Sequence, residues 1–196
     1  NDLKPDIIFF TGDIVDDLTQ VEPARELIRS LKAEIGIFGI AGDTDHIVMD
    51  GKSLARELDP AGADFLVDEY RRIPLESGNF LWLMGLDSKS GEVELDRMLV
   101  AVTDHVPKIL LAESPDMFEE TVERRIQLLL VGDTHGGQIG IPLLIHMSEY
   151  ANRTLYMKGL FERDRTKMYV NRGIGTKTLP IRFLCRPEIA VIEVKA

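Results

Sequence analysis

Four apolar runs of the chain each lead into an acidic residue, and two of these places carry a second side chain able to ligate a metal. The side chains concerned are Asp13, Asp43, Asp45, Glu113, Asp133 and His135. In open α/β sheets the carboxyl ends of neighbouring strands face one crevice, so neighbouring strands would bring these side chains together. Carboxylates crowded in this way repel one another, and bound cations relieve the repulsion. The pattern therefore predicts a carboxylate-rich divalent-metal site at the ends of the strands.

Each of these residues also has an interpretation that needs no metal. Gly-Asp pairs are frequent in turns, so Asp13, Asp43 and Asp45 could each cap a turn after a buried strand. Glu113 precedes a helix start, where an acidic residue is favourable to the helix dipole. Repetition of the arrangement at four separate strand ends favours the metal site over these separate explanations.

The apolar pattern predicts an α/β fold in which strands alternate with covering helices. The expected strands span residues 6–11, 35–41, 65–67, 80–86, 108–112 and 126–131. Apolar stripes at helical spacing predict helices around Leu27 and Leu54, and a further helix is expected over residues 92–103. After Gly132 the chain is rich in glycine, and strands are expected at 154–160, 168–170, 181–184 and 189–194. These last strands predict an antiparallel finish to the sheet system.

Length and composition are those of one globular domain over residues 1–196. With 44% hydrophobic and 29% charged residues, the chain can bury a continuous core. Its 23 basic and 33 acidic residues give a net charge of −10, which disfavours binding to nucleic-acid backbones and to anionic lipid surfaces. The single cysteine, Cys185, has no partner for an internal disulfide, and we expect it to serve ordinary packing.

The chain shows neither a membrane segment nor an export signal. No stretch approaches the roughly 18 consecutive apolar residues of a membrane helix, and the residues that follow Asn1 have no signal-peptide pattern. The chain has no initiator Met and enters an apolar strand almost at once. We therefore expect a fragment that is cytoplasmic or peripheral to the membrane, with any targeting segment upstream of the residues given.

Several segments resemble the calcineurin-like metallophosphoesterase family, specifically its bacterial branch of single-domain enzymes. Residues 4–13 (KPDIIFFTGD) look like the family's G-D strand, residues 110–116 (LLAESPD) like its L-L-x-H-x-P-D segment, and residues 132–138 (GDTHGGQ) like its G-H-T-H-G-G-Q loop. The tail, residues 169–189, is very similar to the closing strands of this branch. The resemblance implies an αββα sandwich of mixed β-sheets flanked by helices, with two metal ions and a phosphomonoester or phosphodiester substrate.

The chain departs from the family pattern at most of the ligand positions. No D-x-H motif precedes Asp13, so the first strand of the family and two ligands of its first metal are missing from the chain. Asp43 stands where the family has an Asn ligand, and Glu113 and Asp133 stand where it has His ligands. Only Asp13 and His135 keep the family's ligand chemistry. Because each departure at a metal position is a carboxylate, which still binds cations, we expect a remodelled site.

The resemblance assigns a role to each candidate ligand. Asp13 bridges the two ions, and His135 belongs to the site of the first. Asp43, Glu113 and Asp133 complete the site of the second. Carboxylate oxygens with a single imidazole are hard ligands, which favours Mn²⁺ or Mg²⁺ over the zinc or iron of His-rich sites.

Two catalytic residues are expected in the segment after the second strand. The family has a His there, assigned to protonation of the leaving group, and this chain has Thr44 in its place, while Asp45 keeps the acid that orients that His. His46 is expected to take over the lost role, the alternative being a bystander in a loop. Asp87 is either a support for the site or a turn cap. The remaining candidates are Arg172, Arg182 and Arg186, which either hold the fold or touch phosphate, and His105 and His146, which match no motif.

The leading interpretation is an enzyme that hydrolyses a small-molecule or lipid-linked phosphoester. The alternative is an impaired or inactive family member that serves as a metal-binding or ligand-binding module, for which Thr44 and the missing D-x-H motif argue. A truncated piece of an active enzyme is the third possibility.

Overall fold

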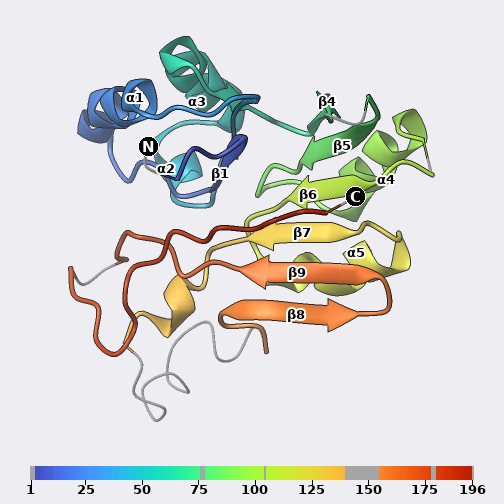
Figure 1. The fold of residues 1–196 in the computed structure, drawn as a ribbon. Coiled ribbons are helices and arrows are strands. Elements are labelled where there is room, and N and C mark those ends of the chain that lie inside the picture. Colours follow the sequence, from blue (N-terminus) through green and yellow to red (C-terminus); the bar gives the residue numbers. More distant parts are fainter. Residues whose placement is uncertain (1–2, 76–77, 104, 140–154, 178–179, 196) are drawn as a thin grey trace.

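The computed structural model describes residues 3–75, 78–103, 105–139, 155–177 and 180–195 (Figure 1). In this part of the chain two β-sheets face each other across a shared apolar layer, and helices pack on the outer face of each sheet. This confirms the α/β sandwich that the sequence predicts. Only the larger of the two described sheets mixes parallel and antiparallel strands.

The smaller sheet has the order β1-β2-β3 and is parallel throughout. Its strands are β1 (Ile7–Thr11), β2 (Gly36–Ile40) and β3 (Asp64–Phe65). The larger sheet has the order β4-β5-β6-β7-β9-β8, in which β5, β6, β7 and β9 are parallel and the edge strands β4 and β8 are antiparallel to their neighbours. These strands are β4 (Glu69–Pro74), β5 (Phe80–Gly85), β6 (Lys108–Leu111), β7 (Leu128–Val131), β8 (Gly159–Arg163) and β9 (Thr166–Val170).

Alternation along the strands divides the core into three layers. On β6, Ile109 and Leu111 face the smaller sheet, whereas Leu110 faces the helices on the outside of the larger sheet. Both faces of the central strands are therefore buried, which explains their almost uninterrupted apolar sequences. Gly85 lies where the sheets approach closely, since a Cβ atom there would collide with Leu66 and Ile40. The sheets are thus pressed together just before β5 ends.

The helices cover the sheets through apolar stripes. Five helical segments pack on or beside the smaller sheet: η1 (Leu18–Gln20), α1 (Val21–Ser30), α2 (Asp45–Val48), α3 (Gly51–Leu58) and η2 (Asp59–Ala61). Three further segments of the described chain pack on the larger sheet: α4 (Glu92–Ala101), η3 (Pro115–Met117) and α5 (Phe118–Glu123). α1 buries Val21, Ala24 and Ile28, which share one face. α3 begins at the N-cap Asp50, whose side chain accepts the Ser53 N–H. The helices predicted around Leu27, around Leu54 and over 92–103 are confirmed.

Two predicted strands are wrong. Residues 189–194 pair with no strand among the described residues, and residues 181–184 contribute only an isolated bridge between Phe183 and Ile139. Both segments are apolar, but their large side chains point to solvent, including Phe183 and Ile189. The pattern of a strand is present there without a neighbouring strand to complete it. The expected strand at 154–160 begins outside the described residues, and β8 starts at Gly159.

The sequence pattern also misses β4. Its sequence, EYRRIP, is mostly polar, and among its side chains only that of Ile73 is buried. β4 forms because it pairs as an edge strand along the whole of β5. In the described parts of the chain, no helix combines the length and the apolar character needed to cross a membrane.

Candidate functional site

The carboxyl ends of four parallel strands in the two sheets bring the predicted acidic residues to one edge of the sandwich. Asp13 follows β1 and Asp43 follows β2 in the smaller sheet, and Glu113 follows β6 and Asp133 follows β7 in the larger. The Asp43 N–H donates to Glu113 Oε1 (2.6 Å), which joins the two sheets at this edge. On the smaller sheet the Thr44 N–H donates to Asp13 Oδ1 (3.0 Å). The structure therefore brings these four residues together.

The backbone around the site is held in unusual conformations. Asp13, Asp133 and His135 have φ angles of 56°, 59° and 49°, in the left-handed region that non-glycine residues adopt at a cost of about 1–3 kcal/mol each. Gly42 is needed for a different reason, because a Cβ atom there would lie 2.5 Å from Asp13 Oδ1 and 2.8 Å from the Glu113 carboxylate. A glycine at this position lets the two carboxyl groups approach the same strand end. Strain of this kind is concentrated at functional sites.

Burial and the charges of neighbouring carboxyl groups raise the pKa values of Glu113 and Asp133 at this edge. Burial, together with the charges of Asp13, Asp43 and Asp133, raises the pKa of Glu113 to about 9. Burial likewise raises the pKa of Asp133 to about 6, although Lys177 opposes that rise. The charged form of a buried carboxylate requires a positive partner. A cation would supply it.

His135 adds a nitrogen ligand to these oxygens. Its Nε2 lies 4.0 Å from Asp13 Oδ2, and its buried Nδ1 has no hydrogen-bond partner within the described structure. Burial lowers the pKa of the imidazole, which favours its neutral form. Neutral imidazole is the form that binds metals.

Asp45, predicted to be catalytic, accepts hydrogen bonds from backbone N–H groups. The side chain is completely buried, and its Oδ1 accepts the N–H groups of Ile14 and Val15 while its Oδ2 accepts that of Gly42, all at 2.8 Å. These bonds tie the loop after β1 to the loop after β2, and burial raises the pKa of Asp45 to about 6. In this structure Asp45 positions the loops that carry Asp13 and Asp43.

His46, the second residue predicted to be catalytic, pairs with Asp87. Its Nε2 lies 2.7 Å from Asp87 Oδ1, and the side chains are only 12% and 5% exposed. Asp87 follows β5 as the metal candidates follow their strands, and it stands two residues after Gly85. The signal for its placement was therefore in the sequence, but the pairing with His46 was not. Sequence reasoning missed Lys89 altogether. Its Nζ lies 2.6 Å from Asp43 Oδ1, which places it beside the site.

The closing segment of the chain holds the loop that carries His135. This loop includes the short helix η4 (His135–Gly137). Arg182 donates to the carbonyl oxygens of His135 (3.2 Å), Arg172 (2.7 Å) and Gly175 (2.7 Å), and the thiol of Cys185 donates to the His135 carbonyl (3.2 Å). Arg172 in turn pairs with Glu188 at 2.7 Å. These contacts support the fold-holding interpretation of Arg172 and Arg182, and Cys185 is buried as expected.

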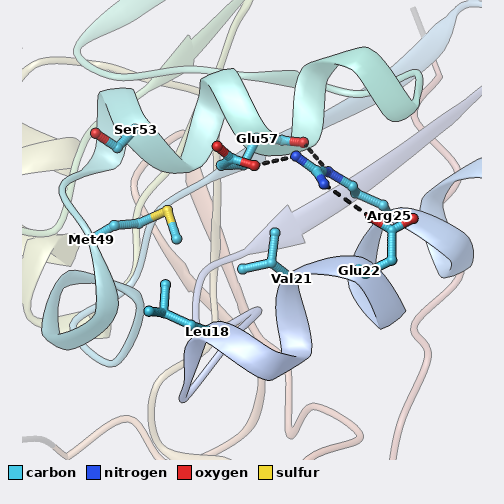
Figure 2. Close-up of a pocket in the computed structure, with 7 residues that line it drawn as sticks. All are labelled: Leu18, Val21, Glu22, Arg25, Met49, Ser53 and Glu57. Carbon is cyan, nitrogen blue, oxygen red and sulfur yellow. Dashed lines mark hydrogen bonds and ion pairs between the residues drawn. The ribbon is translucent and has the colours of Figure 1, made fainter.

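The other candidates lie apart from this edge or cannot be placed. Arg186 and His105 are exposed, and His146 lies outside the described residues. A groove of about 470 Å³ between α1 and α3 also lies apart, because none of the predicted ligands lines it (Figure 2). Its lining residues are Leu18, Val21, Glu22, Arg25, Met49, Ser53 and Glu57.

The donor chemistry of the edge fits a hard divalent cation. Within the described ranges, no three acidic, His or Cys side chains are already arranged to hold a metal ion. Asp13 and Glu113 each accept a backbone N–H, and Asp43 accepts the Lys89 ammonium. Carboxylate oxygens such as these are the ligands that Mg²⁺, Mn²⁺ and Ca²⁺ prefer.

Comparison with known proteins gives several relatives along the whole chain. YkuE of Bacillus subtilis (strain 168), named a metallophosphoesterase, is 34% identical over 202 residues, which cover 100% of this chain and 70% of that protein. The phosphodiesterase YaeI of Escherichia coli (strain K12) is 27% identical, with 97% of this chain and 70% of that protein covered. A transmembrane protein with a metallophosphoesterase domain from Danio rerio is also 27% identical, and 47% of that protein is covered.

Among solved structures, the phosphopantetheinyl hydrolase PptH of Mycobacterium tuberculosis superposes with a TM-score of 0.51 over 85% of this chain and 78% of that one. The identity is 7%, so this similarity concerns the fold alone. No family model matches the chain.

Proposed function

The chain belongs to the metallophosphoesterase family, whose members are metal-dependent phosphoester hydrolases, and we propose that its cations are held by Asp13, Asp43, Glu113, Asp133 and His135. The observation that carries this proposal is the burial of Glu113 among three other carboxyl groups, which raises its pKa to about 9. A buried carboxyl group in such surroundings is stabilised in its charged form by a cation. The residues 1–196 act as one catalytic domain in this proposal.

The proposed ligands divide as the family resemblance implies. Asp13 would be shared between two ions, His135 would serve the first, and the remaining three carboxylates would serve the second. Because four of the five ligands are carboxylates, we favour Mn²⁺ or Mg²⁺. When bound, the metal supplies positive charge to the phosphoryl oxygens and lowers the pKa of water.

His46 is proposed as the proton donor to the leaving group. Asp87 Oδ1 lies 2.7 Å from His46 Nε2, so an Nε2–H bond to Asp87 leaves Nδ1 as the nitrogen that exchanges a proton with the substrate. Asp87 is itself held in place because its backbone N–H donates to Asp68 Oδ1 (3.0 Å). Such a donor contributes about 10²–10⁴ in rate when the leaving group is basic.

The substrate that we propose is a small-molecule or lipid-linked phosphodiester. The similarity to YaeI, which is named a phosphodiesterase, supports a diester. The net charge of −10 opposes association with long nucleic acids.

Hydrolysis assays test the function directly. Bis(p-nitrophenyl) phosphate and p-nitrophenyl phosphate are offered to the chelator-treated chain with Mn²⁺, Mg²⁺, Ca²⁺ or no metal. We expect turnover that depends on Mn²⁺ or Mg²⁺ and is lost in Asp13→Asn and Asp133→Asn. Asp50→Asn is the matched control, because Asp50 is an exposed helix cap whose N-capping bond an Asn can also make. Turnover without added metal, or turnover unchanged in Asp13→Asn, would overturn the proposal.

A further inference from the structure

We propose that Lys89 competes with the divalent cation for Asp43, and that its ammonium group turns to the phosphate of the substrate once the cation has taken Asp43. The inference rests on the proposed function, since it requires that Asp43 be a metal ligand. It assigns a role to a residue that no family motif marks.

The contact joins the two sheets across the mouth of the site. Lys89 follows β5 in the larger sheet and Asp43 follows β2 in the smaller, and Lys89 Nζ lies 2.6 Å from Asp43 Oδ1. The side chains are 57% and 53% exposed, so the pair lies at the entrance and not in the core. Asp43 also differs from Asp13 and Glu113, whose hydrogen-bonded oxygens accept backbone N–H groups. The ammonium thus occupies a carboxylate that is directed to solvent at the edge of the cluster.

The backbone of Lys89 is fixed while its side chain is free to change partners. The Lys89 N–H donates to Asp87 Oδ1 (2.9 Å), and Asp68 accepts both the Asp87 N–H (3.0 Å) and the Ser90 hydroxyl (2.6 Å). The loop therefore holds the base of the lysine beside the site, close to the His46–Asp87 pair. The four-carbon stem above this base can swing, and an exposed lysine–carboxylate pair is weak. A divalent cation at Asp43 would displace the ammonium at little cost.

The displaced ammonium remains at the entrance to the site. A lysine side chain is a compact point charge suited to phosphate oxygens. Once a cation occupies Asp43, the ammonium can turn to the phosphate of an incoming substrate. One residue would thus reduce the charge of the empty site and bind the substrate in the filled one.

Cation binding tests the first half of the inference. Mn²⁺ is titrated calorimetrically into chelator-treated wild type, Lys89→Gln, Asp43→Asn and the double variant. Removing the competing charge should tighten Mn²⁺ binding about three- to fivefold in Lys89→Gln. The same substitution should change affinity less than about twofold in the Asp43→Asn background, because the shared partner is then absent. Lys89→Arg, which keeps the charge, should bind Mn²⁺ as the wild type does.

Lys167→Gln is the matched control. Lys167 pairs with Glu162 at 3.9 Å with side-chain exposures of 55% and 58%, close to those of the Lys89 pair. It lies opposite Leu128 at the start of β7, at the far end of the sheet from Asp133. Its loss removes one positive charge from the chain without touching the site, so Mn²⁺ affinity should stay within about twofold of the wild type.

Binding of inorganic phosphate tests the second half. With Mn²⁺ saturating, Lys89→Gln should bind inorganic phosphate about tenfold more weakly than the wild type and the Lys167→Gln control. Mn²⁺ affinity that is unchanged in Lys89→Gln, or that rises equally in the presence and absence of Asp43, would overturn the competition. Unchanged phosphate affinity would overturn the role in substrate binding. If the wild type binds no Mn²⁺ at all, the proposed function fails and this inference fails with it.

Discussion

Replacing Glu113 with Gln should make the metal-free chain more stable at alkaline pH. Glu113 is 5% exposed, and burial among neighbouring carboxylates raises its pKa from 4.5 to about 9. A carboxyl group whose pKa is raised by folding stabilises the fold below its unfolded pKa, and that stability is lost as pH rises towards the folded pKa. Gln keeps a side-chain oxygen that can accept the Asp43 N–H, and it cannot ionise.

The size of the effect follows from the width of this pH window. Between about pH 5 and pH 8, Glu113 is charged in the unfolded chain and protonated in the folded one, so unfolding releases about one proton. Stability then falls by about 1.4 kcal/mol per pH unit, or about 4 kcal/mol over the interval. The variant lacks this loss. Asp45 and Asp133, whose pKa values are raised to about 6, add a loss of the same sign below pH 6 in both proteins.

Urea unfolding measures this difference. Wild type and Glu113→Gln are unfolded with chelator present at about pH 5 and about pH 8, and the free energies are extrapolated to water. The two should be similar at the lower pH, and the variant should be more stable by several kcal/mol at the higher. Saturating Mn²⁺ should stabilise the wild type by about 2.7 kcal/mol at one hundred times its dissociation constant and the variant by less. Equal pH dependence of the two metal-free proteins would contradict the surroundings described for Glu113.

Three further substitutions test separate parts of the site. Asp45→Ala leaves three N–H groups, two of them buried, without an acceptor. It should lower the free energy of unfolding measured in urea by about 2–5 kcal/mol, with a smaller loss for the helix-cap variant Asp50→Ala. His46→Asn should lower kcat about 10²–10⁴-fold for a diester with an alkyl leaving group and far less for a p-nitrophenyl ester, whose leaving group needs no proton; equal losses on both would exclude proton donation. Arg182→Ala removes the donor to the carbonyl oxygens of His135 and Arg172, and it should weaken Mn²⁺ binding measured by calorimetry. Arg186→Ala, at an exposed neighbouring position, should leave Mn²⁺ affinity unchanged. Unchanged affinity in both variants would show that Arg182 is not needed to hold the His135 loop.

The strand-end arrangement of the site could be predicted because it depends on local patterns. Strands such as β1 and β7 have apolar sequences that stop at a Gly-Asp pair, and parallel strands of one sheet place their ends at one edge. Asp13 and Asp43 thus share one edge of the smaller sheet and Glu113 and Asp133 one edge of the larger, and the packing of the two sheets joins these edges. Their service as metal ligands stays a prediction until a metal is bound.

Contacts between distant loops could not be predicted in the same way. His46 and Asp87 are 41 residues apart, and Lys89 and Asp43 are 46 apart. Each pairing depends on how closely the two sheets pack. That distance depends on contacts such as the one at Gly85, where a Cβ atom would not fit, and the apolar periodicity of the sequence does not reveal it. The failure at residues 189–194 has the opposite cause, since the apolar pattern of a strand is there and a partner strand is not.

Metal-dependent turnover by the chain itself is the most direct measurement. Initial rates with bis(p-nitrophenyl) phosphate are followed as Mn²⁺ is titrated into chelator-treated wild type, Asp13→Asn and Asp50→Asn. The wild type and Asp50→Asn should gain activity with a shared Mn²⁺ midpoint that matches the calorimetric dissociation constant, and Asp13→Asn should stay inactive at the same concentrations. Calorimetric Mn²⁺ binding at full occupancy without any turnover by the wild type would contradict a hydrolase and leave a metal-binding domain in its place.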